Sequence, residues 1–354
     1  MLDFLQNQSK LLSLDPKIPH IVELQLTYDC NLRCPYCFNP THMDRKKLSI
    51  EEWKSIIKQV VELGTKILIF TGGEPLKYEG VIELIKYAKS FNTITALSSN
   101  GLLLNENGIK IIRDYLDLMQ LSLHVYRYAN SDDYNIFRNL EYFYKKIILF
   151  KEKEGEHKAA IFHLSIYANL YEKLKKILKL IIELDAKYRK LDALIIQPVL
   201  PAGFAYKNPK IIPKFKEIIQ INEIVSDLEA EYNRHISFKI INRAKDYFKV
   251  KPNIWGYYGM IINPEGYVLP LVESADTLLY EGVIKFDNVR ENSIDKIWKN
   301  SVALNMFRQN DWFKEPCISC EFVEKCRGGS RVFAYLFLND IYAPDPFCPK
   351  TLRD

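Results

Sequence analysis

Cys30-Asn31-Leu32-Arg33-Cys34-Pro35-Tyr36-Cys37 is the stretch of this chain on which its fold and its chemistry depend. Its three cysteines are separated by three residues and then by two, with a tyrosine directly before the last. Thiolates this close together suit three corners of one metal or cluster site, and they leave a fourth corner open. A zinc ion held by the same thiolates and a neighbour such as His42 is the alternative.

The other cysteines of the chain also lie close to one another. All seven fall into two groups, the three above and a second group of Cys317, Cys320, Cys326 and Cys348. An odd number of cysteines, in a chain that carries no secretion signal, argues against a disulfide framework. The distribution therefore indicates thiolate ligation at two places.

Composition limits what kind of protein this is. The 354 residues, 48% hydrophobic and 26% charged, predict a large α/β domain followed by a smaller one. The sequence has no apolar run of about 18 residues and begins with a polar segment, so we expect a cytoplasmic protein outside the membrane. The net charge of +5 comes from scattered lysines, which indicates solvated helix faces rather than a nucleic-acid site.

Short apolar runs alternate with amphipathic segments over the first 200 residues or so. Predicted strands cover Ile21–Leu26, Lys66–Phe70, Thr93–Leu97, Leu118–Leu123, Ala160–Ile166 and Ala193–Gln197. Predicted helices cover Ser49–Gly64, with a capping box of Ser49 and Glu52, then Val81–Phe91, Ile109–Tyr115, Tyr134–Lys153 and Tyr171–Ala186. Six β/α units imply a parallel sheet closed or partly closed into a barrel, with the functional loops on one rim.

Two rim loops resemble motifs of a known family. Leu26 to Cys37 is similar to the signature loop of the radical S-adenosylmethionine (SAM) superfamily, and Thr71-Gly72-Gly73-Glu74-Pro75 resembles its second motif. In that family three cysteines bind a 4Fe–4S cluster, and SAM chelates the fourth iron. The resemblance implies a partial (β/α)6 radical SAM barrel in which Cys30, Cys34 and Cys37 are the catalytic cluster ligands.

The resemblance also implies which residues bind SAM. Gly72 and Gly73 lack a Cβ and let the backbone approach the ligand closely, while Glu74 can accept a hydrogen bond from the methionine ammonium. The remaining expected contacts are Tyr36 for adenine, Ser99, Asn100 and Ser122 for ribose, Arg138 or Ser165 for the carboxylate, and Gln197 at the end of the last strand. Each of these polar side chains has the alternative of bonding backbone groups of the rim.

Two further rim positions depart from the family pattern. His124 stands where an acidic residue is more usual, and both a structural role and a substrate contact are open for it. Gly203 lies in the loop after the last strand, and Phe204 follows it where an arginine is common.

A second module is expected after a helix over Lys214–Asn233. Gly259–Pro270 predicts a hairpin with a turn at Pro264-Glu265-Gly266, Asn288–Trp298 leads into a helix, and the cysteine-rich tail follows. This order resembles the SPASM and twitch extensions that hold auxiliary iron–sulfur clusters. The expected boundaries are an N-terminal extension over 1–19, the barrel over 20–212, a linking helical segment over 213–254 and a SPASM/twitch-like domain over 255–354.

The tail predicts a single auxiliary cluster. A full SPASM domain has cysteines where this chain has Ser330 and near Gly256 and Leu271, and none is present. We therefore expect one auxiliary 4Fe–4S cluster, ligated by the second cysteine group; a structural zinc ion is the alternative.

The resemblance implies an enzyme that reductively cleaves SAM to a 5′-deoxyadenosyl radical, which abstracts a hydrogen from the substrate. Modification of a ribosomally made peptide by cross-linking, epimerisation or oxidation is the favoured reaction. The alternatives are a non-peptide small molecule such as a tetrapyrrole, maturation of a whole protein, or a non-catalytic electron carrier. Expected partners are a flavodoxin- or ferredoxin-type electron donor and, because only 29 residues precede Cys30, a separate small leader-recognition protein.

Overall fold

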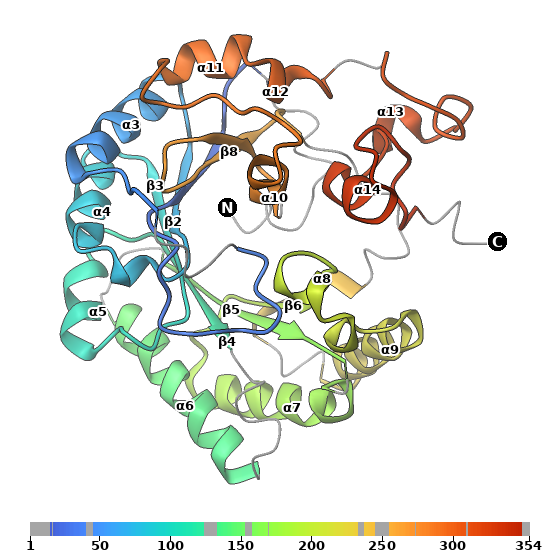
Figure 1. Ribbon diagram of the computed structural model, residues 1–354. Coiled ribbons are helices and arrows are strands. Elements are labelled where there is room, and N and C mark those ends of the chain that lie inside the picture. The colour runs from blue at the N-terminus through green and yellow to red at the C-terminus, as the bar shows by residue number, and fades with distance from the viewer. Residues whose placement is uncertain are drawn as a thin grey trace.

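The chain folds around one curved, mostly parallel sheet with helices on its outer face (Figure 1). The computed structural model describes residues 15, 17–39, 45–123, 133–152, 158–168, 170–232, 237–244, 255–272, 274–308 and 311–348. The strand order is β7-β6-β5-β4-β3-β2-β1-β8-β9. Since β7 and β9 are the two edges, the sheet is a partial barrel, as the sequence predicted.

The predicted β/α units are present with ends shifted by a few residues. The strands are β1 (Ile21–Gln25), β2 (Ile67–Thr71), β3 (Ile94–Ser99), β4 (Leu118–Leu123), β5 (Ala159–Ile166), β6 (Ala193–Pro198), β7 (Lys239–Asn242), β8 (Gly259–Ile262) and β9 (Val268–Pro270). The barrel helices are α3 (Ile50–Glu62), α4 (Val81–Lys89), α5 (Glu106–Ile112), α6 (Asp133–Phe150), α7 (Tyr171–Tyr188), α8 (Phe204–Lys207) and α9 (Phe215–Glu231), with short 3-10 turns η1 (Pro75–Lys77) and η3 (Pro209–Ile211). The C-terminal helices are α10 (Ala275–Tyr280), α11 (Ile294–Asn300), α12 (Val302–Asn305), α13 (Val323–Cys326) and α14 (Arg331–Leu338). The predicted capping box of Ser49 and Glu52 is present at the start of α3.

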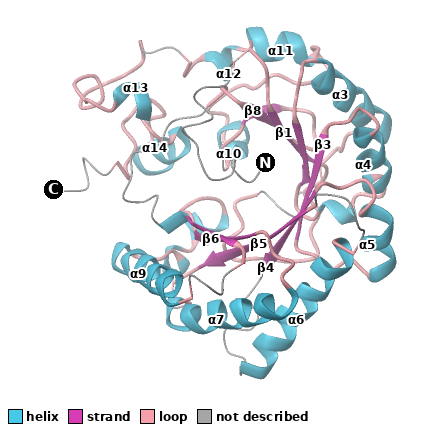
Figure 2. Cartoon of the chain, turned by 180° about the vertical axis from the view of Figure 1, so that it is seen from behind, coloured by secondary structure: helices cyan, strands magenta, loops and turns pink. Residues whose placement is uncertain are grey.

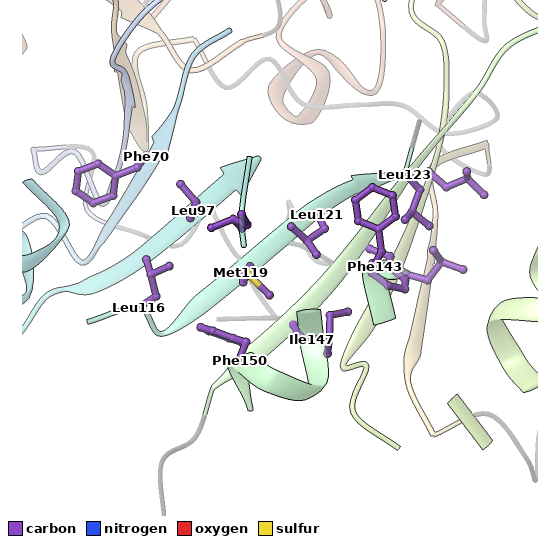
Figure 3. Close-up of a cluster of buried hydrophobic side chains, with 14 of the residues drawn as sticks. Phe70, Leu97, Leu116, Met119, Leu121, Leu123, Phe143, Ile147 and Phe150 are labelled. Atoms are coloured by element: carbon purple, nitrogen blue, oxygen red, sulfur yellow. The ribbon is translucent and has the colours of Figure 1, made fainter. Parts of the chain in front are cut away.

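The outer face of the sheet forms the main hydrophobic core. Successive strand residues face opposite sides, and crossover helices cover the outer side, so outward residues are sealed from water. Figure 2 shows these helices from behind. Figure 3 shows part of the core, where Met119 of β4 lies close to Ile147 and Phe150 of α6.

The inner face of the sheet is apolar at one end and polar at the other. A separate buried cluster forms the apolar part, and it comprises Ala96, Leu118, Ile161, Ala193, Ile195 and Ile241. Nearer the carboxyl ends of the strands, the inward side chains are polar and only half-buried: Ser98, Gln120, Ser122, His163, Ser165 and Gln197. The lumen therefore has an apolar floor and a polar wall that stays partly accessible.

The C-terminal hairpin continues the barrel sheet, which the sequence pattern did not predict. β8 pairs with β1 in parallel, with Ile21 opposite Gly259, and β9 pairs with β8 in antiparallel. The segment expected to be a helical link also contributes a strand, since β7 pairs with β6. The run Lys239-Ile240-Ile241-Asn242 was missed because it is short and polar at both ends.

The C-terminal helices approach the barrel again at its open side. Figure 1 places α14 and α8 on the two sides of that opening. Tyr206 of α8 donates a hydrogen bond to Leu336 O of α14 at 2.7 Å, and its ring packs edge-on against Phe337. In the described part of the chain, no helix has both the length and the apolar character needed to cross a bilayer.

The close contact between β1 and β8 leaves no room for a side chain at Gly259, so substitution there should destabilise the fold. A Cβ at Gly259 would lie 2.2 Å from Ile21 O, so Gly259→Ala should cost about 1 to 3 kcal/mol of unfolding free energy through overpacking. Urea unfolding followed by tryptophan fluorescence measures this. Gly108→Ala, in helix α5, is the matched control and should be neutral or stabilising. Equal stability of both variants and the wild type would contradict the tight packing of β8 on β1.

Candidate functional site

The loop with the first three cysteines follows β1 at the carboxyl edge of the sheet. Its turns are local: Leu32 N donates to Cys30 Sγ at 3.4 Å, and Cys37 N donates to Cys34 O at 3.1 Å. All three cysteines are half-buried, so their thiols are partly accessible from the rim. Burial, chiefly, raises the pKa of the Cys30 thiol above its usual range.

The loop after β2 binds the start of the cysteine loop through its backbone. Gly73 N donates to Thr27 O at 2.6 Å, and Glu74 N donates to Asp29 O at 2.8 Å. A Cβ on Gly73 would lie 2.4 Å from Asp29 O, and one on Gly72 would lie 2.5 Å from Thr27 O. The glycines are therefore required by contact between the two loops, and their expected close approach to a ligand stays a prediction.

Glu74 is hydrogen-bonded through its side chain to two other expected site residues, Ser99 and Asn100. Its side chain is fully buried, and its carboxylate accepts hydrogen bonds from Ser99 Oγ and Asn100 N, both at 2.8 Å, and from Leu76 N at 3.2 Å. Burial raises the pKa of the Glu74 carboxyl, and these donors oppose that rise. Because the carboxylate already has three protein donors, its expected contact with a methionine ammonium stays a prediction.

Asn100 links the end of β3 to the cysteine loop. Its Nδ2 donates to Oδ1 of Asn31, the residue directly after Cys30, at 2.7 Å. Ser99 and Asn100 are both nearly fully buried, which places them beneath the rim rather than on its surface. The structure thus brings Ser99 and Asn100, two of the three residues expected around ribose, next to the cysteine loop.

The other expected contacts are distributed between the lumen and the outer layer. Ser122 and Ser165 face the lumen from β4 and β5. Gln197 of β6 lies opposite Ser165 in the strand pairing. Arg138 is exposed on α6, which covers the outer face, so of the two carboxylate candidates it is Ser165 that faces the lumen. His124 and the alternative zinc ligand His42 lie outside the described residues.

His163 is a lumen residue that sequence reasoning missed. It lies in the middle of β5, beside Ser122 on one neighbouring strand and Ile195 on the other. Burial, and then the positive charge of Arg243, lowers the pKa of His163 to about 4, so the ring is neutral at pH 7. A histidine that interrupts the apolar alternation of a predicted strand, two residues before Ser165, was the available signal.

The far end of the cysteine loop packs against the loop after β6. Phe204 N donates to Cys37 O at 2.9 Å, and a Cβ on Gly203 would lie 2.5 Å from the same oxygen. Tyr36 faces Tyr167, the residue after β5, with ring centroids 6.4 Å apart and planes inclined by 15°. This gives Gly203 a packing role and puts a second aromatic ring beside the tyrosine expected to contact adenine.

The four C-terminal cysteines influence one another electrostatically. Burial, followed by the negative charges of Cys348, Asp345 and Cys317, raises the pKa of Cys326 to about 12. Burial also raises the pKa of Cys317, with Cys348 and Cys320 adding to it. Thiols that repel as anions in this way are stabilised when they bind iron, so the donor set suits a cluster.

Buried Arg331 and half-buried Asp345 hold the segments that carry the last two cysteines. Arg331 donates to Ala343 O at 2.7 Å and to Ile341 O at 3.0 Å. The Asp345 carboxylate accepts from Ser330 N at 2.7 Å and from Phe347 N at 2.9 Å. Ser330 caps α14 through Phe333 N, so the residue found in place of a family cysteine has a structural role.

Both donor sets suit iron–sulfur clusters. The first offers three thiolates and an open position, and the second offers four thiolates. Among the described residues, no three His, Cys, Asp or Glu side chains are grouped as a site for one metal ion. The thiolates of a 4Fe–4S cluster each bind a different iron atom, so they need not converge on one point.

Comparison with known proteins identifies relatives for nearly the whole chain. Residues 24–181 match the model of the radical SAM superfamily, and residues 254–321 match an iron–sulfur cluster-binding domain. The PqqA peptide cyclase of Bradyrhizobium diazoefficiens is 31% identical over 341 residues, which cover 94% of this chain and 86% of the relative.

Solved structures share the fold. Streptococcus suis SuiB bound to S-adenosylmethionine has a TM-score of 0.71 at 19% identity, covering 94% of this chain and 77% of that one. SuiB bound to its precursor peptide SuiA has a TM-score of 0.69 at 18% identity, covering 94% and 76%.

The position of His163 predicts a pH-dependent stability. Its pKa is lowered in the folded chain, so the unfolded chain binds the proton first, and stability should fall as the pH decreases from 6.5 towards 4. The loss for this half-buried group should reach about 2 to 3 kcal/mol. Urea unfolding of wild type and His163→Gln across this pH range isolates the contribution of His163 to the unfolding free energy, because the effects of acid on other groups are the same in both proteins and cancel in the difference. An identical pH slope for the two proteins would contradict the lowered pKa of His163.

Proposed function

Because this chain belongs to the radical SAM superfamily, we propose that it modifies a ribosomally made peptide by radical chemistry. The observation that carries the proposal is its 31% identity to a PqqA peptide cyclase over 94% of the chain and 86% of that relative. A precursor peptide is also bound in one of the structures that share its fold. The reaction would be a cross-link, an epimerisation or an oxidation within the peptide.

The cofactors are SAM, the 4Fe–4S cluster that binds it and an auxiliary iron–sulfur cluster. When bound, the SAM-binding cluster supplies the electron that cleaves SAM to methionine and a 5′-deoxyadenosyl radical, and this radical takes a hydrogen atom from the substrate. The protein must keep water and stray hydrogen donors away from that position. The apolar floor of the lumen, formed by residues such as Ile161 and Ile195, suits this requirement.

We assign the cofactor contacts as follows. Cys30, Cys34 and Cys37 hold the SAM-binding cluster, and Cys317, Cys320, Cys326 and Cys348 hold the auxiliary one. Tyr36, Gly72, Gly73, Glu74, Ser99, Asn100, Ser122, Arg138 or Ser165, and Gln197 surround SAM. The burial of Glu74, Ser99 and Asn100 beside the cysteine loop supports the central part of this assignment.

The polar wall of the lumen would orient the substrate. Gln120 Nε2 donates to Ser98 Oγ at 3.1 Å, and neutral His163 lies beside Ser122. Such side chains can donate and accept hydrogen bonds without carrying a charge, which suits a peptide side chain or amide. A polar substrate group held above the apolar floor would keep one C–H bond in reach of the radical.

We divide the chain into an N-terminal extension over 1–19, a barrel over 20–212, a linking segment over 213–254 and a cluster-binding module over 255–354. The hairpin β8–β9 joins the module to the barrel through one sheet, so these two parts share a common frame.

We also propose two protein partners and a location. A flavodoxin- or ferredoxin-type protein would supply the electron, because SAM cleavage consumes one. A small recognition protein would hold the peptide's leader while the lumen takes the residue to be modified. The seven cysteines, which form no disulfide in the described structure, and the reductive chemistry suit the cytoplasm, where thiols stay reduced.

The assignment of the first three cysteines predicts a complete loss of SAM cleavage when they are removed. The Cys30→Ala, Cys34→Ala, Cys37→Ala triple variant should form no 5′-deoxyadenosine under anaerobic conditions with dithionite and SAM. Mass spectrometry of the quenched reaction measures the product. Persistent 5′-deoxyadenosine would contradict the assignment.

The assignment of the second group predicts a change in metal content. The wild type, reconstituted anaerobically, should hold roughly eight iron atoms, and a Cys317→Ala, Cys320→Ala variant about four. Iron and sulfide analysis measures both. An unchanged iron content, or zinc in place of iron, would contradict the auxiliary cluster.

The peptide proposal is tested with short peptides encoded beside the gene. Each is incubated anaerobically with the enzyme, SAM and reductant in deuterated water. A loss of two hydrogens indicates cross-linking or oxidation, and deuterium uptake without another change indicates epimerisation. A modified tetrapyrrole with unmodified peptides would overturn the peptide assignment while leaving the radical chemistry intact.

A further inference from the structure

The first turn of α10 contacts the cysteine loop at both of its ends. Asp276 accepts a hydrogen bond from the hydroxyl of Tyr28, two residues before Cys30, at 2.5 Å. Ser274 Oγ donates to the carbonyl of Phe38, the residue after Cys37, at 3.2 Å. One helical turn of the C-terminal module therefore holds the chain on both sides of the three thiols.

The Tyr28–Asp276 contact is buried and supported by neighbours. Tyr28 and Asp276 are 1% and 3% exposed. Asn263 Nδ2 donates to Asp276 Oδ1 at 3.3 Å, and the hydroxyl oxygens of Tyr28 and Tyr280 lie 3.0 Å apart. Water cannot replace a hydrogen bond lost in such a place without rearrangement, so each partner should be costly to remove.

Ser274 stands at the N-cap of α10, but its side chain does not cap the helix. Its φ there is +60°. A left-handed conformation is unfavourable for a residue with a Cβ, and N-cap serines normally bond the helix backbone. Here the hydroxyl reaches Phe38 O instead, so the local conformation serves a contact with the cysteine loop.

The backbone of the same segment is fixed from the opposite side. The carbonyls of Thr27 and Asp29 accept hydrogen bonds from Gly73 and Glu74 of the β2 loop. Tyr28 lies between them, and its side chain reaches α10. The start of the cysteine loop is therefore held by the barrel through its backbone and by the C-terminal module through one side chain.

We propose that Asp276 and Ser274 are positioning residues for the SAM-binding cluster, which makes the C-terminal module a part of the radical-forming site. This rests on the proposed assignment of Cys30, Cys34 and Cys37 to that cluster. The module then has a role distinct from holding an auxiliary cluster: it sets the position of the three thiolates and, through them, of the open corner that binds SAM. The two residues act through Tyr28 and Phe38, to which they are hydrogen-bonded.

The test compares Asp276→Ala and Tyr28→Phe with the conservative Asp276→Asn, which keeps an oxygen acceptor for Tyr28. Asp295→Ala, an exposed aspartate paired with Lys299 in the same module, is the matched control. Electron paramagnetic resonance of the reduced holoenzyme, titrated with SAM, reports both the cluster signal and the Kd for SAM. Iron content and thermal stability are measured on the same samples.

We expect Asp276→Ala and Tyr28→Phe to bind SAM about tenfold more weakly, since one hydrogen bond to a charged or buried partner is lost. The SAM-induced change in their cluster signal should be altered or heterogeneous, with iron content unchanged. Asp276→Asn and Asp295→Ala should stay within about threefold of the wild type. A merely structural contact would lower the thermal stability and leave the signal and the Kd as they are.

The outcomes separate this inference from the proposed function. If the wild type shows no SAM-dependent change in its cluster signal, the proposed function itself fails. If the wild type shows that change and both Asp276→Ala and Tyr28→Phe reproduce it with the same Kd, the positioning role is overturned. If Asp276→Ala does not fold, Tyr28→Phe decides alone, because it keeps the aromatic packing and removes only the hydroxyl.

Discussion

The site depends on a contact between two stretches of backbone at the ends of neighbouring parallel strands. Gly73 N and Glu74 N bond the carbonyls of Thr27 and Asp29, and the space in which a Cβ of either glycine would lie is filled by that same backbone. Parallel pairing of β1 and β2 brings the two loops to the same edge of the sheet. The cysteine loop therefore begins in a fixed place, and the buried Glu74 carboxylate extends the same bonding to Ser99 and Asn100 of β3.

The continuous sheet fixes the C-terminal module, which carries the second cysteine group, against the barrel, which carries the first. Because β8 lies in parallel against β1, the C-terminal module starts beside the strand that leads into the cysteine loop. The turn of α10 can then reach Tyr28 and Phe38, while α14 reaches α8 across the open side of the barrel. A separate domain on a flexible link would make none of these contacts reproducibly.

Much of this could be predicted from the sequence, because strand periodicity, the Ser49–Glu52 capping box and the two glycine- and cysteine-containing loops are local signals. The β1–β8 pairing could not, since a run such as Gly259–Ile262 carries no information about which distant edge it joins. The contact of the two glycines with the cysteine loop could not be predicted for the same reason, because it depends on the backbone of another loop. Asp276 was missed because its burial and its bond to Tyr28, rather than its residue type, give it its importance. A histidine within a predicted strand was a signal for His163, but only the fold shows which groups surround it.

The central claim is that SAM binds directly at the open corner left by Cys30, Cys34 and Cys37. Electron–nuclear double resonance on the reduced holoenzyme tests it, with SAM carrying ¹⁵N in its methionine amino group and ¹³C in its carboxylate. Direct binding of SAM predicts hyperfine coupling from both labels to the cluster, and the loss of that coupling when the three cysteines are replaced by alanine. Reduced, intact clusters that show no coupling to either label would contradict it.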